Sequence, residues 1–210
     1  MFKKLIFGLC LWLFATTLSF GANLQDGYSA YMKGDLKTAF IIFEELAEKG
    51  DIEAQYNLGD MYRDGEGVRQ DYKKAIYWYE KAANQGYAPA QYNLGVMYEN
   101  GQGVRQDYKK AIEWYEKAAN QGYGMAQYNL GVMYHNGYGV RQDYKKSKEW
   151  FEKSATQGFA EAQFNLGVMY GNGYGVRQDK KVAKEYYGKA CDDGLQVGCD
   201  EYKNLNQQGY

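Results

Sequence analysis

The stretch "AQYNLGVMYENGQGVRQDYKKAIEWYEKAANQGY", residues 90–123, decides the fold because the chain carries it in four closely similar copies. Aligned on the Ala-Gln step, the copies begin at Ala54, Ala90, Ala126 and Ala162, with a period of 36 residues and no insertion or deletion. A fixed period of about 20–50 residues is typical of stacked supersecondary units. Enzymes usually gather different residues at one site, whereas this repetition predicts a surface that is made by stacking.

Each copy is predicted to form two helices. In the first helix, apolar residues recur at i, i+4, i+7 and i+8, on the single face formed by Ala54, Leu58, Met61 and Tyr62. "DGEG" then breaks the helix with Gly65 in the left-handed C-terminal position, and Asp71 is the predicted N-cap of the second helix. The second helix ends at Gly86, and its apolar stripe comprises Tyr72, Ala75, Ile76, Tyr79, Ala82 and Ala83.

One glycine lies inside every first helix, at Gly59, Gly95, Gly131 and Gly167. Each of these glycines costs about 1 kcal/mol in helix propensity relative to alanine. Such a cost is tolerable where close backbone packing returns more free energy. We therefore interpret the glycines as contact points between helices, with bulky Tyr and with Trp78 or Trp114 filling the space opposite.

The two ends of the array depart from the repeat. Residues 22–53 form a shorter unit in which "KGD" joins the helices directly, and residues 198–210 resemble only the start of a first helix. Atypical terminal units cover the exposed ends of a solenoid. The predicted organisation is therefore a short unit at 22–53, full repeats at 54–89, 90–125, 126–161 and 162–197, and a capping helix at 198–210.

The N-terminus has the pattern of a signal peptide. Lys3 and Lys4 precede the apolar run "LIFGLCLWLF", and the small residues Ser19 and Gly21 place cleavage after Gly21 or one residue later. The run is also long enough to remain as an uncleaved anchor. Leu9 precedes Cys10, so a lipoprotein cleavage site is not expected.

Composition and cysteine content bound the class of protein. The 210 residues carry a net charge of −1, which favours neither nucleic acid nor an anionic membrane as the partner. Cleavage would leave two cysteines, Cys191 and Cys199, and an even count in an exported protein indicates a disulfide. A reduced pair or a pair of metal ligands is the alternative, although a metal site with a single histidine and no further thiol would be unusual.

The pattern "GxGVxxDxxKAxxWYxKAAxQGxAxAQYNLGxMY" resembles the Sel1-like repeat family, the longer-looped relatives of tetratricopeptide repeats. Four copies match it nearly throughout, and the unit "GDLKTAFIIFEELAEKGD" is more similar to a plain tetratricopeptide repeat. The resemblance implies an all-α, right-handed α-solenoid that binds a protein or peptide on its concave face. A repeat motif predicts a fold far better than it predicts a particular function.

The Cys-x7-Cys spacing resembles the cysteine-rich Sel1-like proteins of Helicobacter, and it implies a bridge from the last second helix to its neighbour. Because some of those relatives are described as penicillin-binding proteins or β-lactamases, a β-lactam-binding protein is the alternative function. None of Ser29, Ser147 and Ser154 begins the Ser-x-x-Lys motif of serine β-lactamases. The one histidine, His135, stands at a position that varies between copies, so we expect a surface residue.

Polar rows on the first helices are the better functional signal. Asparagine recurs at one position of each copy, and it suits the backbone of a bound peptide because its amide both donates and accepts. These asparagines are Asn57, Asn93, Asn129 and Asn165. Three and seven residues further on, the same face carries polar side chains at Asp60, Asp64, Asn100, Asn136 and Asn172. In an equally favoured interpretation, each asparagine caps or bridges its own repeat and does not contact a ligand.

A second row lies in the loops, at Arg69, Arg105, Arg141 and Arg177. It could bind acidic partners, but pairing with nearby carboxylates or loop carbonyls is the favoured interpretation. The sequence as a whole predicts an exported scaffold that binds a protein or peptide, without catalytic residues, cofactor or metal. The expected location is the periplasm of a Gram-negative bacterium, or the medium if the protein is secreted. A purely structural envelope protein is a third possibility.

Overall fold

The computed structural model of the chain describes residues 23–210, and the signal peptide predicted at residues 1–21 lies outside the described residues. Within this range the secondary structure is entirely helical. The helices are α1 (Leu24–Met32), α2 (Leu36–Glu48), α3 (Ile52–Asp64), α4 (Tyr72–Asn84), α5 (Ala88–Asn100), α6 (Tyr108–Asn120), α7 (Gly124–Asn136), α8 (Tyr144–Ala155), α9 (Ala160–Asn172), α10 (Lys180–Asp192) and α11 (Gln196–Gln207). From residue 23 onward, no helix is long and apolar enough to cross a membrane.

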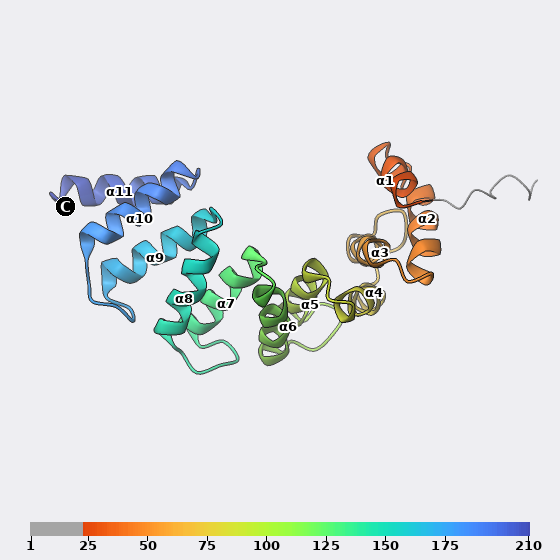
Figure 1. Cartoon of the computed structure of the whole chain (residues 1–210), viewed down its shortest axis with the longest axis horizontal. Coiled ribbons are helices and arrows are strands. Elements are labelled where there is room, and N and C mark those ends of the chain that lie inside the picture. Colours follow the sequence, from red (N-terminus) through yellow and green to blue (C-terminus); the bar gives the residue numbers. More distant parts are fainter. Residues whose placement is uncertain (1–22) are drawn as a thin grey trace, which may run out of the picture.

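The helices form an α-solenoid that is bent into an open crescent (Figure 1). Each helix packs against the next along the chain, from α1 at one tip of the crescent to α11 at the other. The first helices α3 and α5 lie toward the inner edge, and the second helices α4 and α6 lie toward the outer edge (Figure 1). The repeat therefore places equivalent residues side by side along the crescent.

The predicted apolar faces form the core. On α3, the four predicted residues Ala54, Leu58, Met61 and Tyr62 are all buried, and five of the six in the predicted stripe of α4 are buried as well. The exception is Tyr72, which is half-buried. Because every repeat supplies buried side chains at equivalent positions, buried residues recur along the whole array.

The glycines inside the first helices are contact points, as predicted. A Cβ added to Gly59 would lie 2.6 Å from the ring of Tyr79, and one added to Gly167 would lie 2.6 Å from the ring of Tyr187. The prediction that Trp78 fills this space is wrong, because the neighbouring Tyr79 faces the glycine. Successive residues of a helix point about 100° apart, so only one of the two can do so.

The helix ends follow the predicted caps. The Asp71 carboxylate accepts hydrogen bonds from the backbone N–H groups of Lys73 and Lys74, at 3.0 and 3.1 Å. Gly65 ends α3 with φ +76°, in the left-handed region. The same N-cap and C-cap recur in the other three full repeats, at Asp107, Asp143, Asp179, Gly101, Gly137 and Gly173.

In the first three full repeats, a buried glutamine (Gln55, Gln91 or Gln127) joins the repeat to the preceding unit. The Nε2 group of Gln91 donates to the carbonyl oxygen of Ala83 at 3.0 Å, and its Oε1 accepts from Gln121 at 2.7 Å. In the last junction Cys191 stands in place of Ala83 and Cys199 stands in place of Gln91, and they form a disulfide with a Cα–Cα distance of 4.6 Å. The disulfide thus replaces a buried hydrogen bond at the end of the array.

Candidate partner-binding face

The inner face is the side of the first helices that the core does not use. It is formed by three rows, each with one residue per repeat: Asn57, Asn93, Asn129 and Asn165; Asp60, Val96, Val132 and Val168; and Asp64, Asn100, Asn136 and Asn172. The first two rows are half-buried and the third is exposed. All three rows share one helical face. The structure therefore brings the predicted side chains onto a single surface.

Two asparagines of the inner face, Asn57 and Asn93, connect neighbouring repeats. Asn57 donates from Nδ2 to the hydroxyl of Tyr28 and to the carbonyl oxygen of Glu53, both at 2.8 Å. Asn93 donates to Asp60 Oδ1 at 3.3 Å. An amide that gives its N–H groups keeps an acceptor oxygen, which suits the N–H of a bound backbone. A structural role for the row is therefore compatible with a role in binding.

Aromatic rings lie beside the asparagines. The half-buried rings of Tyr56, Tyr92, Tyr128 and Phe164 take one position in each first helix. Tyr56 packs against Tyr79 and Tyr87, with centroids 5.9 and 5.3 Å apart. Burial raises the pKa of the Tyr56 hydroxyl, so it stays protonated at neutral pH. The rings are thus partly core and partly surface.

One end of the inner face is acidic. Asp60 Oδ1 accepts a hydrogen bond from the Tyr79 hydroxyl at 2.6 Å and lies 3.0 Å from Arg63 Nη1. Burial raises the pKa of Asp60, and these partners lower it again. Arg63 also pairs with Asp64, with Nη2 and Oδ2 2.6 Å apart. In the later repeats, valine takes the place of Asp60, so only the end at α3 carries this cluster.

His135 is half-buried, so its side chain lies only partly at the surface. Its ring meets the rings of Tyr144 and Tyr174 edge-on, with centroids 5.1 and 5.6 Å away. Its Nδ1 is buried and has no hydrogen-bond partner within residues 23–210. Burial lowers the pKa of the imidazole, so the neutral form is favoured in the folded chain. The residue at this position differs between repeats together with the side chains that it contacts. In the preceding repeat the equivalent residue is Glu99, which accepts a hydrogen bond from Tyr115.

Comparison with known proteins assigns the family. The Sel1 repeat model matches residues 21–51, 52–87, 88–123, 124–159 and 160–195. The chain belongs to the Sel1 repeat family. The model also includes the short first unit, and it begins each full repeat two residues before the Ala-Gln step, where the first helices begin. Sel1 repeat proteins generally mediate protein–protein interaction. Among curated proteins, no relative matches this chain.

Solved structures give the same assignment. A protective antigen present in uropathogenic Escherichia coli strains is 42% identical over 81% of this chain, with a TM-score of 0.79, and the match covers 36% of the antigen. A Sel1 repeat protein from Oxalobacter formigenes is 31% identical over 83% of this chain and 70% of its own, with a TM-score of 0.78. Cysteine-rich protein B of Helicobacter pylori is 25% identical over 62% of this chain and 94% of its own, with a TM-score of 0.50. The present chain therefore spans about a third of the E. coli protein.

Two of the candidate serines in this Sel1 repeat chain are unsuited to nucleophilic catalysis. Ser147 and Ser154 are fully buried, and their hydroxyls donate to the carbonyl oxygens of Gly131 at 2.8 Å and Gly124 at 3.0 Å. Within residues 23–210, no three His, Cys, Asp or Glu side chains cluster closely enough to hold a metal ion.

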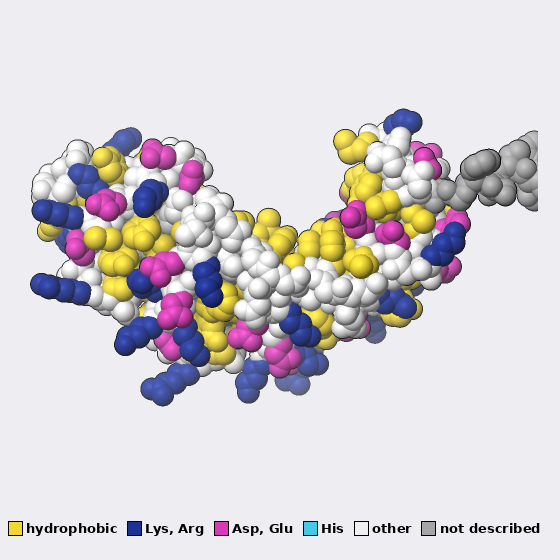
Figure 2. Space-filling model, in the orientation of Figure 1, with side chains coloured by type: hydrophobic (Ala, Val, Ile, Leu, Met, Phe, Trp, Pro, Cys, Tyr) yellow, Lys and Arg dark blue, Asp and Glu magenta, His cyan; other side chains and the backbone are white. Residues whose placement is uncertain are grey.

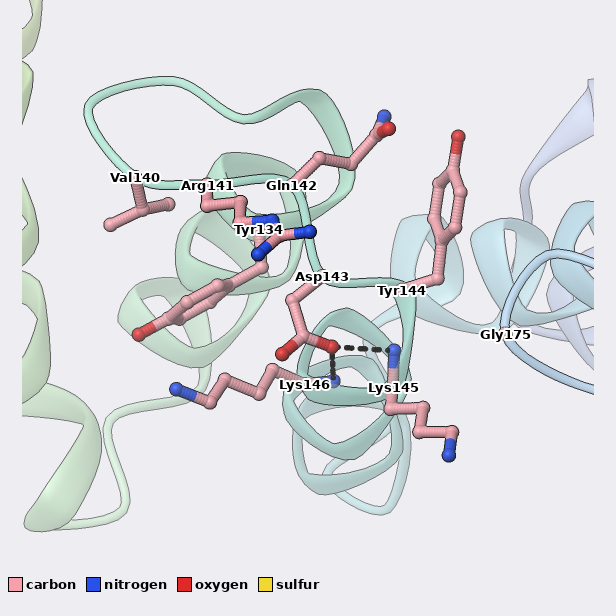
Figure 3. A pocket seen from close by; sticks show the side chains of 9 residues that line it. All are labelled: Tyr134, Val140, Arg141, Gln142, Asp143, Tyr144, Lys145, Lys146 and Gly175. Atoms are coloured by element: carbon pink, nitrogen blue, oxygen red, sulfur yellow. Dashed lines mark hydrogen bonds between the residues drawn. The ribbon is translucent and has the colours of Figure 1, made fainter.

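Sequence reasoning missed a pair of pockets between the loops and the second helices. One lies beside Arg141 and is also lined by Tyr134, Asp143, Lys145 and Lys146 (Figure 3). The equivalent residues one repeat earlier line a second pocket: Tyr98, Arg105, Asp107, Lys109 and Lys110. The arginine row could be seen in the sequence, but each pocket also depends on how the loop meets the following repeat, which contributes Gly175 to the first pocket and Gly139 to the second.

Proposed function

We propose that this Sel1 repeat protein is an exported, non-catalytic scaffold that holds an extended segment of another protein along its inner face. The observation that carries the proposal is the continuous row of half-buried asparagines beside a row of aromatic rings. The 36-residue period repeats these contacts without changing their chemistry. Such a surface suits a ligand that is itself repetitive, and a polypeptide backbone is one.

The chemistry of the inner face indicates how the segment would bind. Amide oxygens of Asn57 and its equivalents would accept backbone N–H groups, which are present in a ligand of almost any sequence. The half-buried Val96, Val132 and Val168 would contact apolar side chains. At the α3 end, Asp60 and Asp64 would favour a basic residue. The ligand would therefore have a preferred direction along the crescent.

Export is part of the proposal. The N-terminal pattern of a signal peptide supports it, and so does the Cys191–Cys199 disulfide, because such bonds persist in oxidising compartments. The periplasm of a Gram-negative bacterium is the location we propose, with secretion as the alternative.

A matched pair of double variants tests which face binds. Asn100 and Asn136 are exposed at the ends of the first helices α5 and α7, and Asn84 and Asn120 are exposed at the ends of the second helices α4 and α6. The variant Asn100→Arg/Asn136→Arg places bulk and charge on the inner face. The variant Asn84→Arg/Asn120→Arg makes the same change to second-helix ends, outside the inner face.

Each immobilised chain is incubated with an envelope extract of the cells that express it, and retained proteins are quantified by mass spectrometry. We expect the unmodified chain and the second-helix variant to retain the same few proteins, and the inner-face variant to lose them. Circular dichroism should show equal helix content for all three chains. Equal retention by both variants, or loss in the second-helix variant alone, would overturn the proposal.

A further inference from the structure

Many of the cationic side chains project along the outer edge of the crescent (Figure 2). Figure 2 shows Lys and Arg side chains projecting along this edge, and none stands out along the middle of the inner edge. Charge is also uneven along the chain, because residues 23–66 contain ten acidic and four basic residues, whereas residues 67–210 contain sixteen acidic and nineteen basic residues. The near-zero total charge therefore conceals an acidic N-terminal part and a slightly basic remainder, which includes the loops of the outer edge.

The arginines of this edge are available to a partner. Arg69, Arg105, Arg141 and Arg177 are all exposed. Within residues 23–210, no salt bridge or hydrogen bond joins their guanidinium groups to another residue, so the predicted pairing with carboxylates or loop carbonyls is wrong. Asp143 shows why: it caps α8, and its Oδ1 accepts the backbone N–H groups of Lys145 and Lys146.

Two of these arginines, Arg105 and Arg141, line pockets that are formed by equivalent residues of successive repeats. In the first, Tyr134 forms a wall, Lys146 Nζ lies 5.2 Å from the centre of that ring, and Arg141 extends into the same space (Figure 3). In the second, Lys110 lies 5.2 Å from the ring of Tyr98 beside Arg105. Each hollow combines three cations with one carboxylate, so each keeps a net positive charge. We call this pair the basic loop pockets.

The shape of the edge favours a flexible chain over a flat surface. The loops that line the basic loop pockets, between α5 and α6 and between α7 and α8, lie on the convex side of the curved array (Figure 1). A planar bilayer could touch such a convex side only near one repeat. A peptide can follow the curve and place one acidic side chain in each hollow. Guanidinium groups bind carboxylates through two parallel hydrogen bonds, which lysine cannot make.

We propose that the basic loop pockets bind an acidic segment of a protein, with its carboxylates at Arg105 and Arg141. This surface lies opposite the inner face, so the protein would bind two ligands of different chemistry at once. The proposal is independent of the one made for the inner face.

A short fluorescein-labelled oligoglutamate peptide serves as the probe, with binding measured by fluorescence anisotropy at low and high salt. Arg105→Ala/Arg141→Ala should weaken binding about tenfold, because two ion pairs are lost. Lys117→Ala/Lys153→Ala removes the same two charges from exposed lysines that lie over Trp114 and Trp150 at 3.8 and 4.0 Å, outside the pockets. This control should bind nearly as tightly as the unmodified chain.

Arg105→Lys/Arg141→Lys keeps the charge and loses the paired hydrogen bonds, so we expect it to bind more weakly than the control. Equal loss in the arginine and control variants would reduce the effect to total charge and overturn the proposal. Two further probes separate other ligands. Binding to vesicles of phosphatidylcholine and phosphatidylglycerol, or to inorganic polyphosphate, without binding to the peptide would also overturn it, as would no binding to any probe.

Discussion

Gly95 offers the sharpest test of how the repeats pack. A Cβ at this position would lie less than 3.0 Å from the ring of Tyr115, closer than real Cβ contacts are found. Tyr115 is 0% exposed and is held between α5 and α6, so its ring has no free space to enter. Overpacking of this kind costs about 1–3 kcal/mol, and alanine returns about 1 kcal/mol in helix propensity. We expect Gly95→Ala to lower the free energy of unfolding by about 1 kcal/mol, and by about 2 kcal/mol at most.

Gly171 is the matched control, because it also lies in a first helix. The nearest atom to its added Cβ would be the Ala183 side chain at 3.6 Å, an ordinary contact. Gly171→Ala should therefore raise stability by up to about 1 kcal/mol. Urea and thermal unfolding followed by far-ultraviolet circular dichroism measure both variants, and each kcal/mol corresponds to about 2–4 °C in Tm. Equal or stabilising effects of the two substitutions would refute the packing assigned to the internal glycines.

Three further results are expected. Reducing the disulfide, which closes a loop with a sequence separation of 8, should cost about 2.5 kcal/mol, and it should raise hydrogen exchange in α11 and not in α3–α6. Because burial lowers the pKa of His135, the unfolded chain takes up the proton first, so stability should fall as pH drops through about 6.5. Denaturant titrations at pH 5.5 to 7.5 should show this slope and its loss in His135→Phe. Gln91→Leu should cost about 1–3 kcal/mol in urea unfolding, because it removes two hydrogen bonds, one to Ala83 O and one from Gln121 Nε2. A neutral effect would contradict the role given to the buried glutamines.

The fold could be predicted from the sequence because the patterns that determine it lie within single repeats. Leu58 and Met61 lie on the predicted apolar face of the first helix, and Gly65 and Asp71 are the predicted caps. All four residues act within one repeat, and the 36-residue period repeats them along the chain. The sequence did not show that Tyr79, and not Trp78, contacts Gly59, since this depends on the rotation of α4 against α3. Neighbouring residues on a helix cannot be distinguished without that rotation.

The candidate site could be predicted only in part, because its side-chain contacts join residues of neighbouring repeats. The partner of Asn57 is Tyr28, and the partner of Asn93 is Asp60, both in the preceding unit. One sequence places these residues in rows but does not show which rows touch. The arginines lack the expected partners for a local reason. The carboxylate two residues after Arg105, that of Asp107, caps the second helix and accepts the backbone N–H groups of Lys109 and Lys110.

The central claim is that the inner face holds a protein partner, and site-specific photo-crosslinking tests it most directly. A photoreactive amino acid is placed at Asn136 on the inner face, or at Asn120 at the end of α6, in cells that express the protein. Both positions are exposed ends of helices, so reactivity toward solvent is matched. We predict a discrete crosslinked species from position 136 and none from position 120. The same species from both positions, or a species from position 120 alone, would contradict the claim.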